Sequence, residues 1–219
     1  MGQIVRILMN SHTRLFFKQF KYANLYEEDL ITVPSSFATC TFRFDKGEDG
    51  TRYWLELSVN QQPFSLLHKK VTLVSNEPCS LVWQNNLIVF EKVSAKKILP
   101  FLEKEFIFIP SQVEDKYYGS YVLQTIRDYP VQATGFHIIE EDPPRKIFLS
   151  LEPNLKMETV IFPVFAYGEK EILPGSKTRV FVSLHREQGT YLFRKITRNT
   201  EWENECLRRL KEWGLREDN

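Results

Sequence analysis

The sequence predicts an α+β fold in which most strands pair in antiparallel sheets, as meanders and hairpins, with about three helices. Three observations predict it. Aromatic residues make up 14% of the 219 residues, apolar and polar residues alternate over many short segments, and turn-forming residues separate those segments. The hydrophobic share of 42% and the charged share of 26% are typical of a globular chain with a buried core. The chain is one large domain or two similar β-rich halves.

Strands are expected first at 37–44 and 53–59, which are rich in β-branched and aromatic residues and flank the turn-forming segment 45–50. A second hairpin turns at Asn85 and Asn86, because asparagine tolerates the positive φ angles of a two-residue turn. Further strands are expected at 134–139, 146–151, 159–167, 179–185 and 191–197.

Two helices are indicated by capping boxes. In the first, Ser111 and Glu114 begin a helix that runs at helical apolar spacing to residue 129. In the second, Thr200 and Glu203 begin a helix that ends near residue 213. A third, short helix starts at Ser94 or restarts at Pro100, because proline interrupts a continuous helix.

The order of the expected elements over 54–101 returns loosely over 160–210. A true duplication places a boundary near residue 105, with a β-rich N-terminal half at 1–105 and an α+β C-terminal half at 106–219. The alternative is a chance likeness of two β-meanders that pack as one domain.

Motifs for known chemistry are missing from the sequence. The segment 174–178 ends in Lys-Thr, but Ser176 and Glu171 stand where a phosphate-binding loop needs glycines, so we interpret it as a turn. The histidines lack partners at ligand spacing, which argues against a metal site; they are His12, His68, His137 and His185. The cysteines are odd in number and far apart, and buried free thiols in a reducing compartment are expected; they are Cys40, Cys79 and Cys206. We therefore expect no enzyme, no cofactor and no small-molecule substrate.

Positive charge gathers between residues 177 and 198, although the net charge of the chain is only +1. Basic side chains beside an aromatic on an exposed sheet suit a phosphate backbone and a stacked base. The alternative is a solvated sheet face that binds nothing. The candidate contact residues for nucleic acid or a neighbouring domain are Lys177, Arg179, Phe181, Arg186, Arg194, Lys195 and Arg198.

Segments that cross or enter a membrane are not expected. The apolar run at the N-terminus is too short for a signal peptide, and no later stretch approaches the roughly 18 apolar residues of a span. The sequence therefore favours a cytoplasmic location without membrane contact.

Several sequence segments resemble those of a known protein family. They are 75–79 together with Asn85 and Asn86 that follow, 99–104, 109–131, and 191–215. In this order they are similar to the N-terminal region of large SWI/SNF-type helicase-like ATPases of Bacteroides-like bacteria, over about 37–215. The resemblance implies a non-catalytic accessory module of an ATP-dependent, helicase-like translocase. Its motor lies downstream, so the implied partners are DNA and the C-terminal ATPase region of the parent protein.

Two other functions remain open from the residues alone. One is a free-standing protein–protein interaction module that uses the helix 111–129 or the sheet edges as contact elements. The other is an enzyme with an unfamiliar site, for which a pocket around His137 and Glu140 is the place to look.

Overall fold

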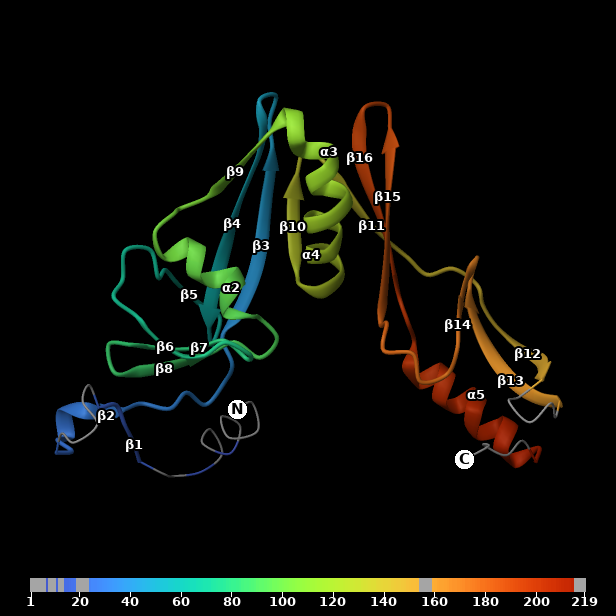
Figure 1. Cartoon of the computed structure of the whole chain (residues 1–219), viewed down its shortest axis with the longest axis horizontal. Coiled ribbons are helices and arrows are strands. Elements are labelled where there is room, and N and C mark those ends of the chain that lie inside the picture. The colour runs from blue at the N-terminus through green and yellow to red at the C-terminus, as the bar shows by residue number, and fades with distance from the viewer. Residues whose placement is uncertain (1–6, 8–10, 12–13, 19–23, 154–158, 215–219) are drawn as a thin grey trace. The chain divides into compact units, whose positions relative to one another are not determined.

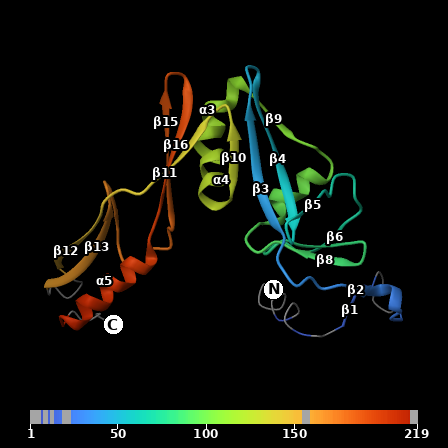
Figure 2. The ribbon, with the colours of Figure 1, turned by 180° about the vertical axis from the view of Figure 1, so that it is seen from behind.

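The structure is a computed structural model that describes residues 7, 11, 14–18, 24–153 and 159–214. It divides the chain into two compact units, Met1–Gly135 and Phe136–Asn219 (Figure 1; Figure 2 shows the ribbon from behind). Of the residues, 47% lie in strands and 22% in helices. This confirms the predicted α+β fold rich in antiparallel sheets. Among the described strands, parallel pairing joins β10 (Val131–Thr134) to β3 (Thr39–Lys46) and β11 (His137–Glu141) to β16 (Thr190–Thr197).

A five-stranded sheet forms the centre of the first unit. Its strands are β3 (Thr39–Lys46), β4 (Gly50–Val59), β5 (Gln62–Phe64), β9 (Ile107–Pro110) and β10 (Val131–Thr134). The order is β10-β3-β4-β5, and β9 pairs with the start of β4. The predicted hairpin 37–59 is therefore the middle of this sheet.

One face of the sheet is covered by a continuous helical segment. It consists of η3 (Ser111–Val113), α3 (Glu114–Tyr117), the π-helical turn η4 (Tyr118–Val122) and α4 (Leu123–Asp128). Alternate residues of the strands point towards this helix and form the core. Among the side chains buried there are Phe42, Phe44, Tyr118, Val122 and Ile126.

The predicted capping box at the start of this helix is wrong. The N-cap is Pro110 rather than Ser111, and no side-chain hydrogen bond caps this start. Glu114 is buried instead, where it accepts a 2.6 Å hydrogen bond from the Thr51 hydroxyl and pairs with Lys46 at 3.0 Å. A buried carboxylate needs such partners, so Glu114 ties the helix to the sheet rather than closing the helix start.

The described part of the first unit also holds a three-stranded sheet of order β6-β7-β8 and a two-stranded sheet of β1 and β2. The remaining elements of this unit are β1 (Leu15–Phe16), η1 (Glu27–Asp29), β2 (Leu30–Ile31), β6 (Thr72–Ser75), β7 (Ser80–Trp83), β8 (Asn86–Val89), α2 (Ala95–Ile98) and η2 (Leu99–Leu102). Both expected starts of the third helix occur, because α2 follows Ser94 and η2 carries Pro100 in its first turn.

In its described residues, the second unit holds two three-stranded sheets and one helix. Its elements are β11 (His137–Glu141), β12 (Arg145–Pro153), β13 (Thr159–Tyr167), β14 (Lys170–Ile172), β15 (Val180–Glu187), β16 (Thr190–Thr197) and α5 (Thr200–Glu212). The sheet orders are β11-β16-β15 and β12-β13-β14. A core cluster of Phe165, Tyr167 and Ile172 receives Phe181 from β15 and Trp202 from α5. The helix begins where it was predicted, but Asn199 and not Thr200 caps it, by accepting the backbone N–H of Trp202.

The boundary between the units lies after Gly135 and not near residue 105. The segments after 105 complete the first sheet, since β9 pairs with β4 and β10 pairs with β3. The predicted strand 134–139 is accordingly two strands, β10 and β11, in different units. Gly135 separates them at φ +82°, and a β-carbon there would lie 2.5 Å from the carbonyl oxygen of Lys46. Only glycine fits this turn.

The proposed repeat is visible in element order but not in pairing. β4, β5, the β7–β8 hairpin and α2 come in the same order as β13, β14, the β15–β16 hairpin and α5, but β6 is an additional strand between β5 and β7. However, β8 is an edge strand of its sheet, whereas β16 is the central strand of its own. Duplication of two similar halves stays a prediction.

Candidate binding site

Strand β4 has an opening along one edge. On that edge it pairs with β9 from Gly50 to Tyr53 and with β5 from Leu57 to Val59. Between them, no strand in the described part of the chain pairs with residues 54–56 on this side. A cavity of about 560 Å³ lies at the opening. The backbone edge of β4 therefore meets a cavity at this point.

The cavity has an apolar wall and a polar rim. The wall consists of Leu55, Leu57, Leu66, Ile98 and Phe101. The rim carries Glu56, Gln61, Lys104 and Glu105. Pockets that bind small molecules have volumes of roughly 300–1,000 Å³, and this cavity lies within that range.

A cluster of tyrosines supports the cavity wall from the core side. Tyr53 packs edge-on against Phe101 at 5.6 Å between ring centroids, and also contacts Tyr117 and Tyr121. Burial raises the pKa of all three tyrosines well above the ordinary value, so they stay protonated at neutral pH. The Lys97 ammonium lies 3.8 Å from the Tyr121 ring centroid, and burial lowers its pKa. These rings act as rigid packing behind Phe101.

The seven contact residues predicted from the sequence do not share one surface. Facing residues of antiparallel strands lie on the same side of the sheet. Ser183 faces Arg194 and Phe181 faces Ile196, which places Arg194 and Phe181 on one side. Val182 faces Lys195 and Arg186 faces Tyr191, which places Lys195 and Arg186 on the other side.

Three of these residues are engaged within the second unit. Arg194 bridges Glu141 and Glu187, at 3.2 Å to each. Lys195 pairs with Glu140 at 2.7 Å. Phe181 packs against the buried core cluster and does not present its ring to a base. Both cations already have carboxylate partners, which lowers the positive potential that the sequence indicated.

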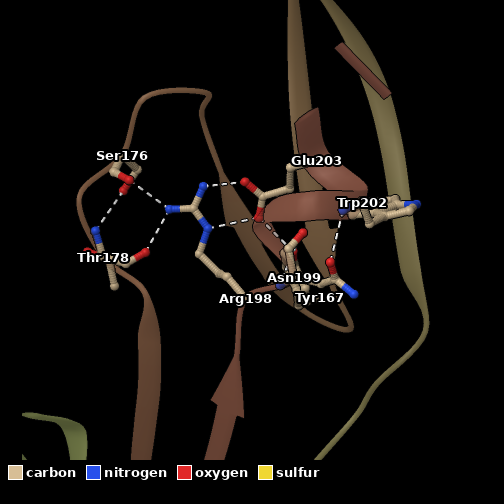
Figure 3. A network of polar contacts seen from close by, with 7 residues as sticks. All are labelled: Tyr167, Ser176, Thr178, Arg198, Asn199, Trp202 and Glu203. Atoms are coloured by element: carbon tan, nitrogen blue, oxygen red, sulfur yellow. Dashed lines mark hydrogen bonds and ion pairs between the residues drawn. The ribbon is translucent and has the colours of Figure 1, made fainter. Parts of the chain in front are cut away.

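Arg198 is a structural residue (Figure 3). Its guanidinium donates to both carboxylate oxygens of Glu203, at 2.9 and 2.5 Å, and to the backbone carbonyls of Ser176 and Thr178, at 2.8 and 2.6 Å. The Tyr167 hydroxyl donates a further hydrogen bond of 2.6 Å to Glu203. This network joins the end of β16 to the loop before β15 and to the first turn of α5, so Arg198 is removed from the candidate contact surface.

The network also sets the protonation of its members. Burial alone raises the pKa of Glu203, but hydrogen bonds from Arg198 and Tyr167 and the positive charge of Arg198 outweigh it and hold the pKa below its ordinary value. Burial, together with the hydrogen bond to Glu203, raises the pKa of Tyr167 to about 12. The ion pair is therefore fully charged at neutral pH.

Lys177, Arg179 and Arg186 are the predicted contact residues that remain exposed. Lys177 and Arg179 lie just before β15, and Arg186 lies near its other end. They are thus at opposite ends of one strand rather than in one patch.

The outer side of the five-stranded sheet carries a mixed basic and aromatic face that was not predicted from the sequence. Register places Arg43 opposite Trp54, and Arg52 opposite the exposed Phe108. The guanidinium carbon of Arg52 lies 5.1 Å from the ring centroid of exposed Phe106. Alternation within the predicted hairpin 37–59 contained the signal for Arg43 and Trp54. The β9 residues could not be found this way, because β9 is distant in sequence.

The geometry bears on two expectations from the sequence, a metal site and a pocket around His137 and Glu140. Within the described ranges, no group of three or more His, Cys, Asp or Glu could hold a metal ion. His137 and Glu140 are exposed on β11, and neither lines the 560 Å³ cavity or the smaller ones of about 260 and 450 Å³. His12 and the N-terminal segment 1–6 lie outside the described residues.

No protein-family model matches the chain, and neither a curated protein nor a solved structure shows significant similarity to it. None of the helices in the described residues has the length and apolar character needed to cross a membrane.

Proposed function

We propose that this chain is a non-catalytic accessory module of a bacterial, cytoplasmic SWI/SNF-type DNA-dependent ATPase, and that it binds an extended polypeptide segment at the opening in β4. The motor domains of the parent protein are the proposed source of that segment. Two things support the proposal. One is the resemblance of sequence segments within 37–215 to the N-terminal region of such ATPases. The other is the cavity at residues 54–56.

The cavity at the opening of β4 is the observation that carries the proposal. An extended segment that enters between β9 and β5 can form main-chain hydrogen bonds with the open edge of β4. Its side chains alternate between the two sides of the strand. Those directed inward meet the apolar wall around Leu55 and Phe101, and polar ones meet the rim at Lys104 and Glu105. A compact nucleotide or a flat base makes no use of the strand edge.

Selection of peptides tests this proposal. A phage-displayed library of random twelve-residue peptides is panned on the full chain, and enriched peptides are titrated by fluorescence anisotropy. The variant Leu67→Trp fills the cavity from its lining, and we expect it to weaken binding by more than about tenfold. The matched control Leu73→Trp changes an exposed leucine on β6 outside the cavity and is expected to leave affinity unchanged.

Peptides that bind both variants as they bind the unchanged chain would refute the cavity as the site. Absence of any cavity-dependent peptide from the selection would do the same. The parentage is tested separately, because the reading frame that encodes the chain is expected to continue past the codon for Asn219 into helicase motifs. A reading frame that ends without helicase motifs refutes the accessory role. The chain would then be a free-standing interaction module, and the proposed peptide site would be unaffected.

Nucleic-acid contact is the second candidate function. The stacking of Arg52 on Phe106 on an open sheet face favours it, because aromatic rings with adjacent cations bind single strands. Titrations with single- and double-stranded DNA at two salt concentrations test it, since phosphate contacts weaken with salt. If Arg52→Glu loses DNA binding, the outer face of the five-stranded sheet is the DNA-binding surface. If Arg179→Glu loses it, the surface at the start of β15 is. Binding that neither variant changes, or that does not depend on salt, removes this candidate.

A further inference from the structure

Strand β12 is an open edge of the sheet β12-β13-β14. Among the described residues it pairs with β13 alone, through an uninterrupted register from Arg145 opposite Tyr167 to Pro153 opposite Thr159. Proteins protect edge strands from association by bulges, by proline and by charged side chains, above all lysine. β12 has no bulge, its proline is the last residue, and its charged residues lie near its two ends, so 147–151 is regular and uncharged. A regular edge of nine residues is therefore available for pairing.

The apolar residues of β12 form a row that is covered at one end only. Ile147, Leu149 and Leu151 alternate onto the same side of the strand. Ile147 packs against the core cluster that also receives Trp202 from α5. Farther along, Leu149 is 52% exposed and Leu151 is 68% exposed. The row thus leaves the core and ends at the surface of the unit.

The charges of β12 are arranged for antiparallel pairing of the strand with itself. Lys146 stands near its start and Glu152 near its end, and both side chains are exposed. A two-fold axis at Leu149 places Lys146 of each copy opposite Glu152 of the other. A shift by two residues, the smallest that keeps the side chains on their faces, removes this match. Charge complementarity therefore selects one register.

We propose that β12 pairs with β12 of a second copy of this chain, antiparallel and centred on Leu149, to make one continuous six-stranded sheet from two three-stranded sheets. The pairing is isologous, so each contact occurs twice. In this register Leu151 of one copy faces Ile147 of the other. The exposed end of each apolar row then adjoins the end that the partner's α5 covers. One arrangement therefore gives the open edge hydrogen-bond partners, the exposed leucines apolar neighbours, and Lys146 and Glu152 opposite charges.

Charge exchange tests the register. Sedimentation velocity of the full chain over about a hundredfold range of concentration should show a monomer–dimer equilibrium. Lys146→Glu and Glu152→Lys each set like charges opposite each other twice, and each is expected to raise the dimer Kd by about tenfold. The double variant restores opposite charges and should return the Kd to within about threefold of the original. Lys170→Glu on β14, away from the β12 edge, is the matched control.

Crosslinking tests the two-fold axis independently. Facing residues of antiparallel strands have α-carbons roughly 4.5–5.5 Å apart, which suits a disulfide. In a Cys206→Ser background, Leu149→Cys is expected to oxidise to a covalent dimer, whereas the exposed Leu173→Cys outside the edge is not. A chain that stays monomeric at the highest concentration overturns the proposal. The proposal is also overturned if the charge-exchange variants leave the dimer Kd unchanged, or if Leu149→Cys does not form a covalent dimer.

Discussion

Arg198 and Glu203 form a doubly hydrogen-bonded ion pair in which the two side chains are only 4% and 6% exposed. Each charge is compensated by the other, and the remaining donors of Arg198 reach two backbone carbonyls. The pair connects three segments of the second unit that are separate in sequence. Removing either partner leaves an uncompensated buried charge.

The substitution Glu203→Gln is expected to destabilise the chain by about 3–5 kcal/mol, because Arg198 then stays buried without its counter-charge. Urea unfolding followed by circular dichroism measures the change. Glu212→Gln on the same helix is the control, since Glu212 is exposed and its pairing with Arg208 is worth at most about 1 kcal/mol. Equal losses in the two variants would show that burial of the pair does not matter.

The same pair predicts a dependence of stability on pH. The folded pKa of Glu203 lies below its unfolded value, so its contribution is complete above the unfolded pKa near 4.5 and is lost as the pH falls through the folded pKa. Melting curves at neutral pH and at acidic pH below 4.5 measure this. The unchanged chain is expected to lose more stability between them than Glu203→Gln does. An equal loss in both would contradict the assignment.

Gly50 begins β4 in a conformation that a side chain does not fit. Its φ is +150°, and a β-carbon there would lie 2.2 Å from the carbonyl oxygen of Ile109 on β9. Gly50→Ala is expected to cost at least roughly 1–3 kcal/mol, from strain and from displacement of β9. The control Gly119→Ala meets no atom within 4 Å and should be neutral or slightly stabilising. Thermal unfolding of both variants provides the comparison.

The three cysteines are expected to differ in reactivity. Burial raises the pKa of Cys40 to about 12 and that of Cys79 to about 11, which keeps both as thiols. Cys206 on α5 is only partly buried. Iodoacetamide labelling followed by peptide mass spectrometry should therefore modify Cys206 first, and the other two only on unfolding. Early modification of Cys40 or Cys79 would show that the core around them opens.

Local sequence patterns predicted the elements of this fold better than their assembly. The hairpin 37–59 and the strand 159–167 follow from alternation and turn residues, which act over short distances. The unit boundary did not follow, because β9 and β10 join the first sheet through pairings with distant strands. The opening in β4 depends on where β5 and β9 stop, and no local pattern encodes it.

The candidate contact residues show the same limit. A run of cations is visible in the sequence, but the carboxylates that pair with Arg194, Lys195 and Arg198 come from β11, from the end of β15 and from α5. The ion pair of Arg198 and Glu203 joins residues only five positions apart. It was not predicted, because the capping pattern at 200–203 assigned Glu203 to the helix start instead. Only partners in space separate a structural arginine from one that binds a ligand.

Amide hydrogen exchange at the β4 opening tests the central proposal most directly. The full chain is labelled with and without a saturating peptide from the selection, and residues 54–56 are followed. Pairing of the peptide with β4 should protect at least one amide hydrogen of this stretch, while exchange along β12, which lies outside the cavity, is the same with and without the peptide. Peptide binding that leaves 54–56 unchanged, or that protects residues outside the cavity instead, would contradict the proposed site.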